Sequence, residues 1–161
     1  MHRLAAPALL LALLLTAACS DEVICTAIGT PVGVSVNVKA PLAARAESAE
    51  MEVCWDGSCE RTRADLYPST RPGTQTCSGD SCGVSAVPTA DKHGFGDVQG
   101  LPKRQVQVRL TLRDAGSEPI LERTVAVTPK GRFPNGPRCG EGGPNAVLTV
   151  EADGTLRESA D

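Results

Sequence analysis

The sequence contains few aromatic residues and a single long apolar run. Phe, Trp and Tyr make up 2% of its 161 residues. A membrane-spanning helix needs about 20 consecutive apolar residues, and the apolar stretch at residues 4–15 is shorter than that. A core with few aromatic rings buries less area per residue, so we expect covalent cross-links to support it.

The sequence also lacks several common signatures of catalysis and metal binding. It has no His-Glu-x-x-His motif, no P-loop, no EF-hand spacing and no Cys-x-x-Cys pair. Beyond the N-terminal leader, His93 is the only histidine, so a Ser-His-Asp or Cys-His hydrolase would have to use it. Because His93 lies in a glycine-rich stretch, we interpret it as a solvated loop residue. We therefore expect no catalytic residue, no cofactor and no metal ligand.

The first 18 residues have the three-part pattern of a secretory signal. A short positive region, Met1–Arg3, precedes the apolar residues 4–15 and the small residues 16–18. The segment Leu15–Cys19 resembles the lipobox of bacterial lipoproteins, with its leucine one position further upstream than in the commonest form. The resemblance implies that Cys19 becomes the first exported residue and carries a lipid. The alternative is cleavage by the ordinary signal peptidase, which leaves Cys19 as a free thiol.

The charge balance excludes one class of partner. Loss of Arg3 with the leader changes the formal net charge from −3 to −4. Nucleic-acid binding requires a basic face, which this mildly acidic chain lacks. The expected location is the extracytoplasmic side of the cell membrane, held there by the lipid on Cys19.

The cysteine count agrees with a lipid on Cys19. Seven cysteines are present, and an odd number in an exported protein needs an explanation. Acylation of Cys19 leaves an even set that can form disulfides. These six are Cys25, Cys54, Cys59, Cys77, Cys82 and Cys139.

Local spacing reduces the possible pairings. Asp56-Gly57 is a strong two-residue turn signal, because a type I′ turn needs positive φ at both central positions, and it places Cys54 opposite Cys59. Cys77 and Cys82 have the same gap around Gly79-Asp80. The remaining pair, Cys25–Cys139, closes a loop of more than one hundred residues. A Cys₄ zinc site made from the two close pairs is the alternative, which an oxidising compartment disfavours.

Alternating apolar residues predict short β-strands with turn signals between them. Residues 32–39 and 105–113 show the clearest alternation. Residues 67–81 and 129–144 are rich in Gly, Pro, Ser and Thr and are predicted as loops, and residues 89–102 as irregular chain. A short helix or a loop precedes a strand in residues 42–50. The further expected strands are residues 49–55, 59–66, 84–87, 120–127 and 146–151.

This pattern predicts an all-β fold, an Ig-like or transthyretin-like sandwich of about seven short antiparallel strands. The expected organisation is a signal peptide at 1–18, a tether at 19–28, the sandwich at 29–151 and a polar tail at 152–161. A Cys25–Cys139 bond would then join the starts of the first and last strands, which are often neighbours in such sandwiches.

The chain as a whole resembles small, uncharacterised lipoproteins of high-GC Gram-positive bacteria. The resemblance rests on Leu15–Cys19, on the Cys54–Cys59 hairpin and on the segment Phe133–Cys139. It implies a location and a fold but no chemistry. The leading hypothesis is a non-enzymatic module that binds a protein or cell-wall partner. The alternative is a metal-binding protein or a hydrolase that uses His93.

Trp55 is the candidate contact for such a partner. Tryptophan is favoured at binding hot spots, and this one lies beside a hairpin turn. Its alternation with Met51 and Val53 predicts a core position instead, and both interpretations stay open.

Overall fold

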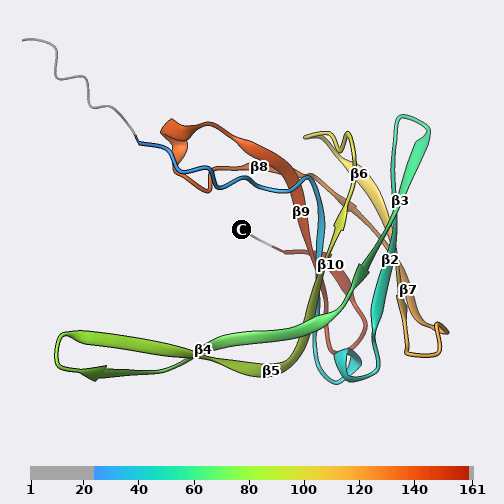
Figure 1. The fold of residues 1–161 in the computed structure, drawn as a ribbon. Coiled ribbons are helices and arrows are strands. Elements are labelled where there is room, and N and C mark those ends of the chain that lie inside the picture. Colours follow the sequence, from blue (N-terminus) through green and yellow to red (C-terminus); the bar gives the residue numbers. More distant parts are fainter. Residues whose placement is uncertain (1–23, 160–161) are drawn as a thin grey trace, which may run out of the picture.

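Strands of alternating apolar and polar residues form two stacked sheets in the computed structural model, which describes residues 24–159 (Figure 1). Sheet A has the strand order β10-β9-β1-β5-β4, with β8 also paired to β9, and sheet B has the order β3-β2-β6-β7. The predicted disulfide-stapled β-sandwich is confirmed. The strands are β1 (Gly33–Val38), β2 (Ser48–Trp55), β3 (Ser58–Asp65), β4 (Tyr67–Ser78), β5 (Ser81–Asp97), β6 (Val106–Arg113), β7 (Pro119–Val127), β8 (Lys130–Arg132), β9 (Gly142–Val150) and β10 (Leu156–Glu158).

The core between the sheets is aliphatic. Alternate residues of β1 and β6 point inward and are fully buried, among them Val36 and Leu110. No aromatic ring occurs among the buried hydrophobic residues of the described chain, and Trp55 packs against the core from its margin while remaining partly exposed. The alternation therefore predicted the inner faces correctly. Trp55 is half-buried at the margin of the core, and its role as a partner contact stays a prediction.

The three disulfides join the cysteines in the expected pairs. Cys54 lies directly opposite Cys59, and both central residues of the turn, Asp56 and Gly57, have positive φ, as a type I′ turn requires. The Cys77–Cys82 bond closes a second hairpin. The long-range Cys25–Cys139 bond spans 114 residues of sequence and joins the segments that precede β1 and β9, which pair in parallel.

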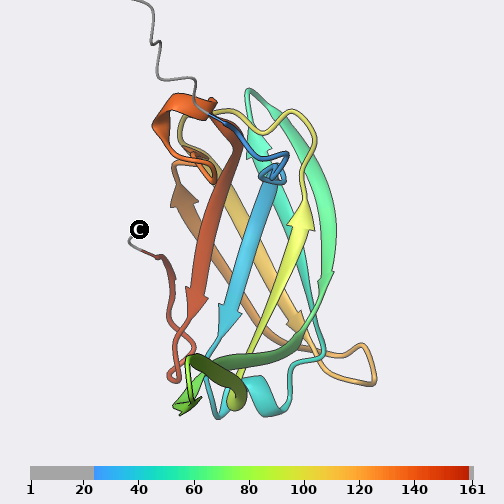
Figure 2. The ribbon, with the colours of Figure 1, turned by 60° about the vertical axis from the view of Figure 1, so that its left-hand side comes forward.

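The predicted loop at residues 67–81 is wrong. β4 and β5 form a long antiparallel hairpin whose outer part projects from the sandwich on the side of sheet A (Figures 1 and 2). We call residues 69–90 the arm. Proline interrupts a ladder of hydrogen bonds only where its nitrogen would have to donate, so Pro68 and Pro72 are tolerated in an edge strand, and two register shifts occur beside them.

Residues 89–97 are also strand rather than irregular chain. Gly94 and Gly96 lie in β5 where sheet B approaches closely. A Cβ at position 94 would lie 2.7 Å from the carbonyl oxygen of Asp65, and one at position 96 would lie 2.7 Å from the Met51 methyl carbon. These glycines make room for the facing sheet. Glycine in a strand can thus indicate close packing as well as a turn.

Smaller differences bring the number of strands to ten. Residues 129–144, predicted as loop, contain β8, the short 3-10 helix η2 (Pro137–Cys139) and the start of β9. Residues 42–44 form a further 3-10 helix, η1, before β2. Part of the expected polar tail forms β10 against β9. Within residues 24–159, no helix is both long and apolar enough to cross a bilayer.

Candidate functional site

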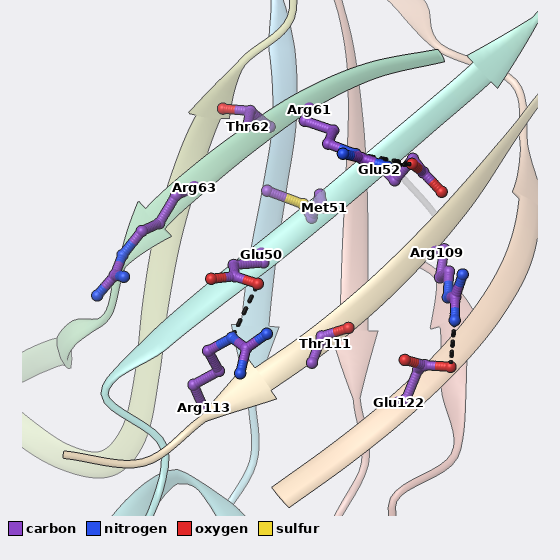
Figure 3. A pocket seen from close by; sticks show the side chains of 10 residues that line it. All are labelled: Glu50, Met51, Glu52, Arg61, Thr62, Arg63, Arg109, Thr111, Arg113 and Glu122. Carbon is purple, nitrogen blue, oxygen red and sulfur yellow. Dashed lines mark hydrogen bonds and ion pairs between the residues drawn. The ribbon is translucent and has the colours of Figure 1, made fainter. Parts of the chain in front are cut away.

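The outer face of sheet B carries a cluster of ion pairs (Figure 3). An open hollow of about 540 Å³ lies there, lined by four arginines and three glutamates among its residues. Each glutamate has an arginine partner at 2.8 or 2.9 Å: the pairs are Glu50–Arg113, Glu52–Arg61 and Glu122–Arg109. Glu122 raises the pKa of Arg109 through a hydrogen bond and its charge. A face whose charges are already paired offers little to a charged ligand.

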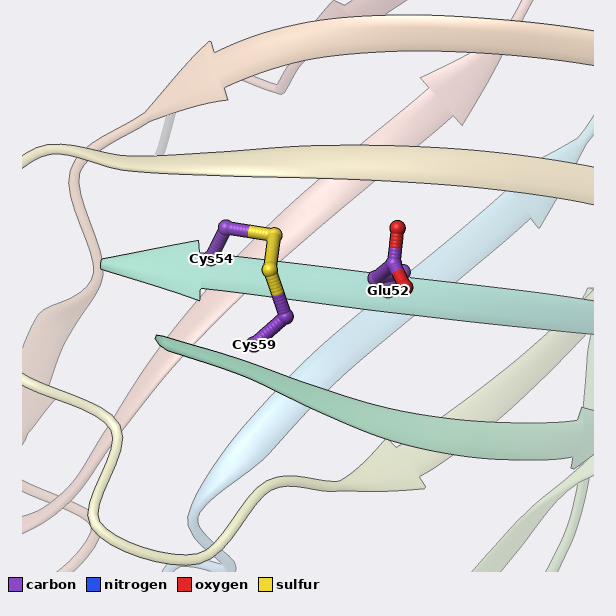
Figure 4. A group of neighbouring side chains, drawn as sticks. All are labelled: Glu52, Cys54 and Cys59. Carbon is purple, nitrogen blue, oxygen red and sulfur yellow. A yellow bond between two sulfur atoms is a disulfide. The ribbon is translucent and has the colours of Figure 1, made fainter. Parts of the chain in front are cut away.

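A group of potential metal ligands lies beside this cluster of ion pairs (Figure 4). One ligand atom each from Glu52, Cys54 and Cys59 lies within 4.8 Å of the others. The two sulfurs are joined in a disulfide, which removes the thiolate form that binds zinc, and the Glu52 carboxylate is paired with Arg61. The zinc alternative therefore loses its ligands here, and the Cys77 and Cys82 sulfurs are likewise bonded to each other.

The outer face of sheet A carries two adjoining hollows at the foot of the arm. One measures about 590 Å³ and the other about 510 Å³, and both are lined by Asn37 and His93. We call them together the recess. Five of its residues lie in two cross-strand rows: Tyr67, His93 and Asn37 are paired in register across β4, β5 and β1, and Phe95 is paired with Ser35 in the next row.

The polar groups of the recess differ from those of sheet B because several have no partner. Within residues 24–159, the side chains of Ser35, Asn37 and Tyr67 make no hydrogen bond, and Tyr67 is 61% exposed. The Phe95 ring extends across Gly33, where a Cβ would lie 2.8 Å from the ring carbon Cζ. Since a side chain at position 33 would displace this ring, Gly33 leaves the space in which the Phe95 ring lies on the sheet.

An ion pair lies at the corner between the arm and the sandwich, and a backbone hydrogen bond supports it. Lys39 Nζ donates to Asp91 Oδ2 at 2.9 Å, and the Ala40 backbone N–H donates to Asp91 Oδ1 at 3.0 Å. The hydrogen bond from Lys39, followed by that from Ala40, holds the pKa of Asp91 below its usual value. Both carboxylate oxygens of Asp91 thus accept hydrogen bonds from the two residues that directly follow β1.

His93 lies in this recess, on a strand rather than in the expected loop. It is exposed, and its Nδ1 lies 3.3 Å from Ser69 Oγ across the hairpin. A Ser-His pair of this kind needs a carboxylate that orients the imidazole. The nearest acid along β5, Asp91, is held by Lys39 and Ala40 instead.

Gly79–Gly83 match the Gly-x-Ser-x-Gly pattern of hydrolase nucleophiles. In the structure this segment is the tip of the arm, where Ser81 pairs with Ser78 and Cys82 is bonded to Cys77. The pattern needs a sharp strand-to-helix turn that exposes the serine beside a histidine. A hairpin tip provides neither, so the match carries no catalytic meaning.

The structure separates the residues that the sequence singled out. His93 is in the recess, whereas Trp55 lies beside the turn of the β2–β3 hairpin in sheet B and lines neither hollow. Cys19, the expected lipid attachment site, lies outside the described residues. The recess residues Tyr67 and Asn37 were missed, because only the pairing of β4, β5 and β1 brings them together.

The segment that leads from the expected anchor into β1 is fixed to the domain. Besides the Cys25–Cys139 bond, the Asn135 side chain donates to the backbone oxygens of Thr26 at 3.0 Å and Ile28 at 2.9 Å. Residues 25–28 are therefore bonded to the domain and do not form a free linker.

We found no family model, no curated protein and no solved structure that matches this chain.

Proposed function

We propose that the protein is a lipid-anchored module of the cell envelope that binds a partner through the recess and the arm, without catalysis. The observation that carries the proposal is the contrast between the two outer faces. In the hollow of sheet B each glutamate is paired with an arginine, whereas the recess presents hydroxyl and amide groups without a partner, an exposed tyrosine ring and a half-buried phenylalanine ring. Exposed polar and aromatic groups that lack partners within the chain are suited to a partner outside it.

The attachment of residues 25–28 supports the proposed anchoring. With a lipid on Cys19, about six residues would separate the membrane from the Cys25–Cys139 bond, a span of roughly 20 Å at full extension. The domain would then stay close to the bilayer. Residues 24–32 and the arm lie at opposite ends of sheet A (Figure 1).

The anchor is tested by intact mass spectrometry of the protein isolated from membranes, with alkylation before or after reduction. The expected result is a chain that starts at Cys19, carries acyl groups and gains six alkyl groups only after reduction. A chain without acyl groups would contradict the anchor. Thiols that react before reduction would contradict the three disulfides.

The hydrolase alternative is tested on the same preparation. Peptide, ester and glycoside substrates are supplied to the wild-type protein and to His93→Ala. We expect no turnover by either protein. Hydrolysis that is present in the wild type and lost in the variant would replace the binding proposal with an enzyme.

A further inference from the structure

We infer that the recess binds an uncharged glycan, whose sugar rings lie on Tyr67 and Phe95 while their hydroxyl groups bond to Ser35, Asn37 and His93. The inference rests on the proposed binding function and names the ligand class of the same site. It follows from three properties of the recess: its charge, its hydrogen-bonding groups and its aromatic surfaces.

The recess has no net charge to offer a ligand. Its charged side chains occur as opposite pairs, Lys39 with Asp91 at 2.9 Å and Arg63 with Asp65 at 3.7 Å. An anionic or cationic ligand would have to compete with these pairs for its counter-charge. An uncharged ligand leaves them intact, so the charge pattern favours a neutral one.

The unpaired polar groups match hydroxyl groups. Serine, asparagine, tyrosine and neutral histidine side chains each donate and accept hydrogen bonds. A sugar hydroxyl does the same, so each contact forms in either direction without a charge. Ser35 and Asn37 are half-buried and unbonded within the described chain, which leaves them available for such contacts.

The aromatic groups match the other surface of a sugar ring. The C–H groups on one face of a pyranose carry a small positive charge and pack on the negative face of an aromatic ring. Tyr67 is 61% exposed, and Phe95 extends over Gly33 in the neighbouring row. Neighbouring strands are about 4.8 Å apart, so the row from Tyr67 to Asn37 is about 10 Å long. An extended ligand can therefore contact both kinds of group.

Other occupants fit less well. A peptide added as a strand to the edge strand β4 would bond to backbone groups, whereas the groups without a partner here are side chains on the face of the sheet. A closed apolar site for a small molecule would enclose its ligand in hydrophobic side chains, whereas these hollows are open and lined largely by polar groups.

The test is native affinity electrophoresis of the full chain, in detergent and with its disulfides intact. The gels contain dextran, mannan, arabinogalactan or soluble starch, and a gel without polysaccharide gives the reference mobility. We expect at least one polysaccharide to retard the wild-type protein. Tyr67→Ala and Phe95→Ala should each weaken this retardation about fivefold to tenfold, the range for loss of one aromatic contact.

Two further variants make the result specific to the recess. Tyr67→Phe keeps the ring and should retain most of the retardation. Phe133→Ala removes another exposed aromatic side chain, one that lines neither hollow, and should leave retardation unchanged. Circular dichroism and the mass of each variant after alkylation confirm its fold and disulfides.

Two outcomes would overturn the inference. One is a folded wild-type protein that no polysaccharide retards, and the other is retardation that Tyr67→Ala and Phe95→Ala both leave unchanged. Neither outcome decides the proposed binding function, which fails instead if the mass measurement finds no anchor or the substrate assay finds a His93-dependent activity.

Discussion

The sandwich and the arm are both antiparallel β-structure, yet they depend on different interactions. In the sandwich the central strands β1, β2 and β6 each bury one face, and Val34 of β1 is fully buried. In the arm both faces meet solvent, and Val84 of β5 is 53% exposed. An isolated two-stranded hairpin is marginally stable in water. The arm is therefore stabilised by the disulfide at its tip and by the sandwich, into which β5 continues at the other end of the arm.

This difference shows that strand structure alone does not indicate a contribution to stability. Apolar burial stabilises the sandwich by about 25 cal/mol for each Å² removed from water. The arm buries little apolar surface and therefore adds little to the stability of the sandwich.

The largest contrast is expected between the disulfides. Replacing Cys25 and Cys139 together by serine removes a link across 114 residues, which the chain-entropy treatment values at about 4–5 kcal/mol. Urea unfolding, followed by the fluorescence of the single tryptophan, Trp55, should show a loss approaching this size.

The matched control replaces Cys77 and Cys82, whose link closes a short loop at the tip of the arm. Its unfolding midpoint should stay close to that of the wild type, while amide exchange in residues 69–90 becomes faster. A control that destabilises the sandwich as much as the first variant would show that the arm and the sandwich unfold as one unit.

Core truncation should separate the two regions next. Leu110→Ala opens a cavity among fully buried residues and should cost about 2–5 kcal/mol. Val84→Ala removes an exposed side chain of the arm and should change stability by about 0.5 kcal/mol or less. Equal losses in thermal unfolding would mean that the arm buries Val84 against something in solution, such as a second copy.

The same contrast explains what the sequence could predict. Residues 33–38 and 106–113 alternate because one face is buried, so their strands were evident. The Asp56-Gly57 turn and the cysteine spacing were local signals. The arm has no such alternation, because neither face needs apolar residues, and its prolines suggested loop. Gly94 and Gly96 suggested loop as well, although they serve close packing of the sheets.

The candidate site was less predictable than the fold. His93 is the only histidine after His2, but nothing near it in the sequence indicates Asn37 or Tyr67. These residues meet because β5 pairs with β1 on one side and with β4 on the other. Register across three strands is set by turn geometry and burial, which a pattern of residue types does not specify for exposed positions.

The smallest predicted effect concerns the junction between the two regions. Lys39 and Ala40 hold the pKa of Asp91 below the usual 3.8, so folding favours the ionised carboxylate. The resulting stability is present above the usual pKa and is lost as pH falls through the lowered one. For a partly exposed pair we expect about 1 kcal/mol or less at neutral pH.

Asp91→Asn tests this contact, because the amide oxygen can still accept from Ala40 but carries no charge. The variant should be less stable than the wild type at pH 7, and the difference should shrink as pH falls below about 4, where the carboxylate becomes protonated. Urea unfolding at pH 7, 5 and 3 measures it. If Asp91 also fixes the arm to the sandwich, amide exchange near residues 89–91 should rise in the variant at pH 7. A stability difference that is constant across this pH range would exclude the Lys39–Asp91 charge interaction as its cause.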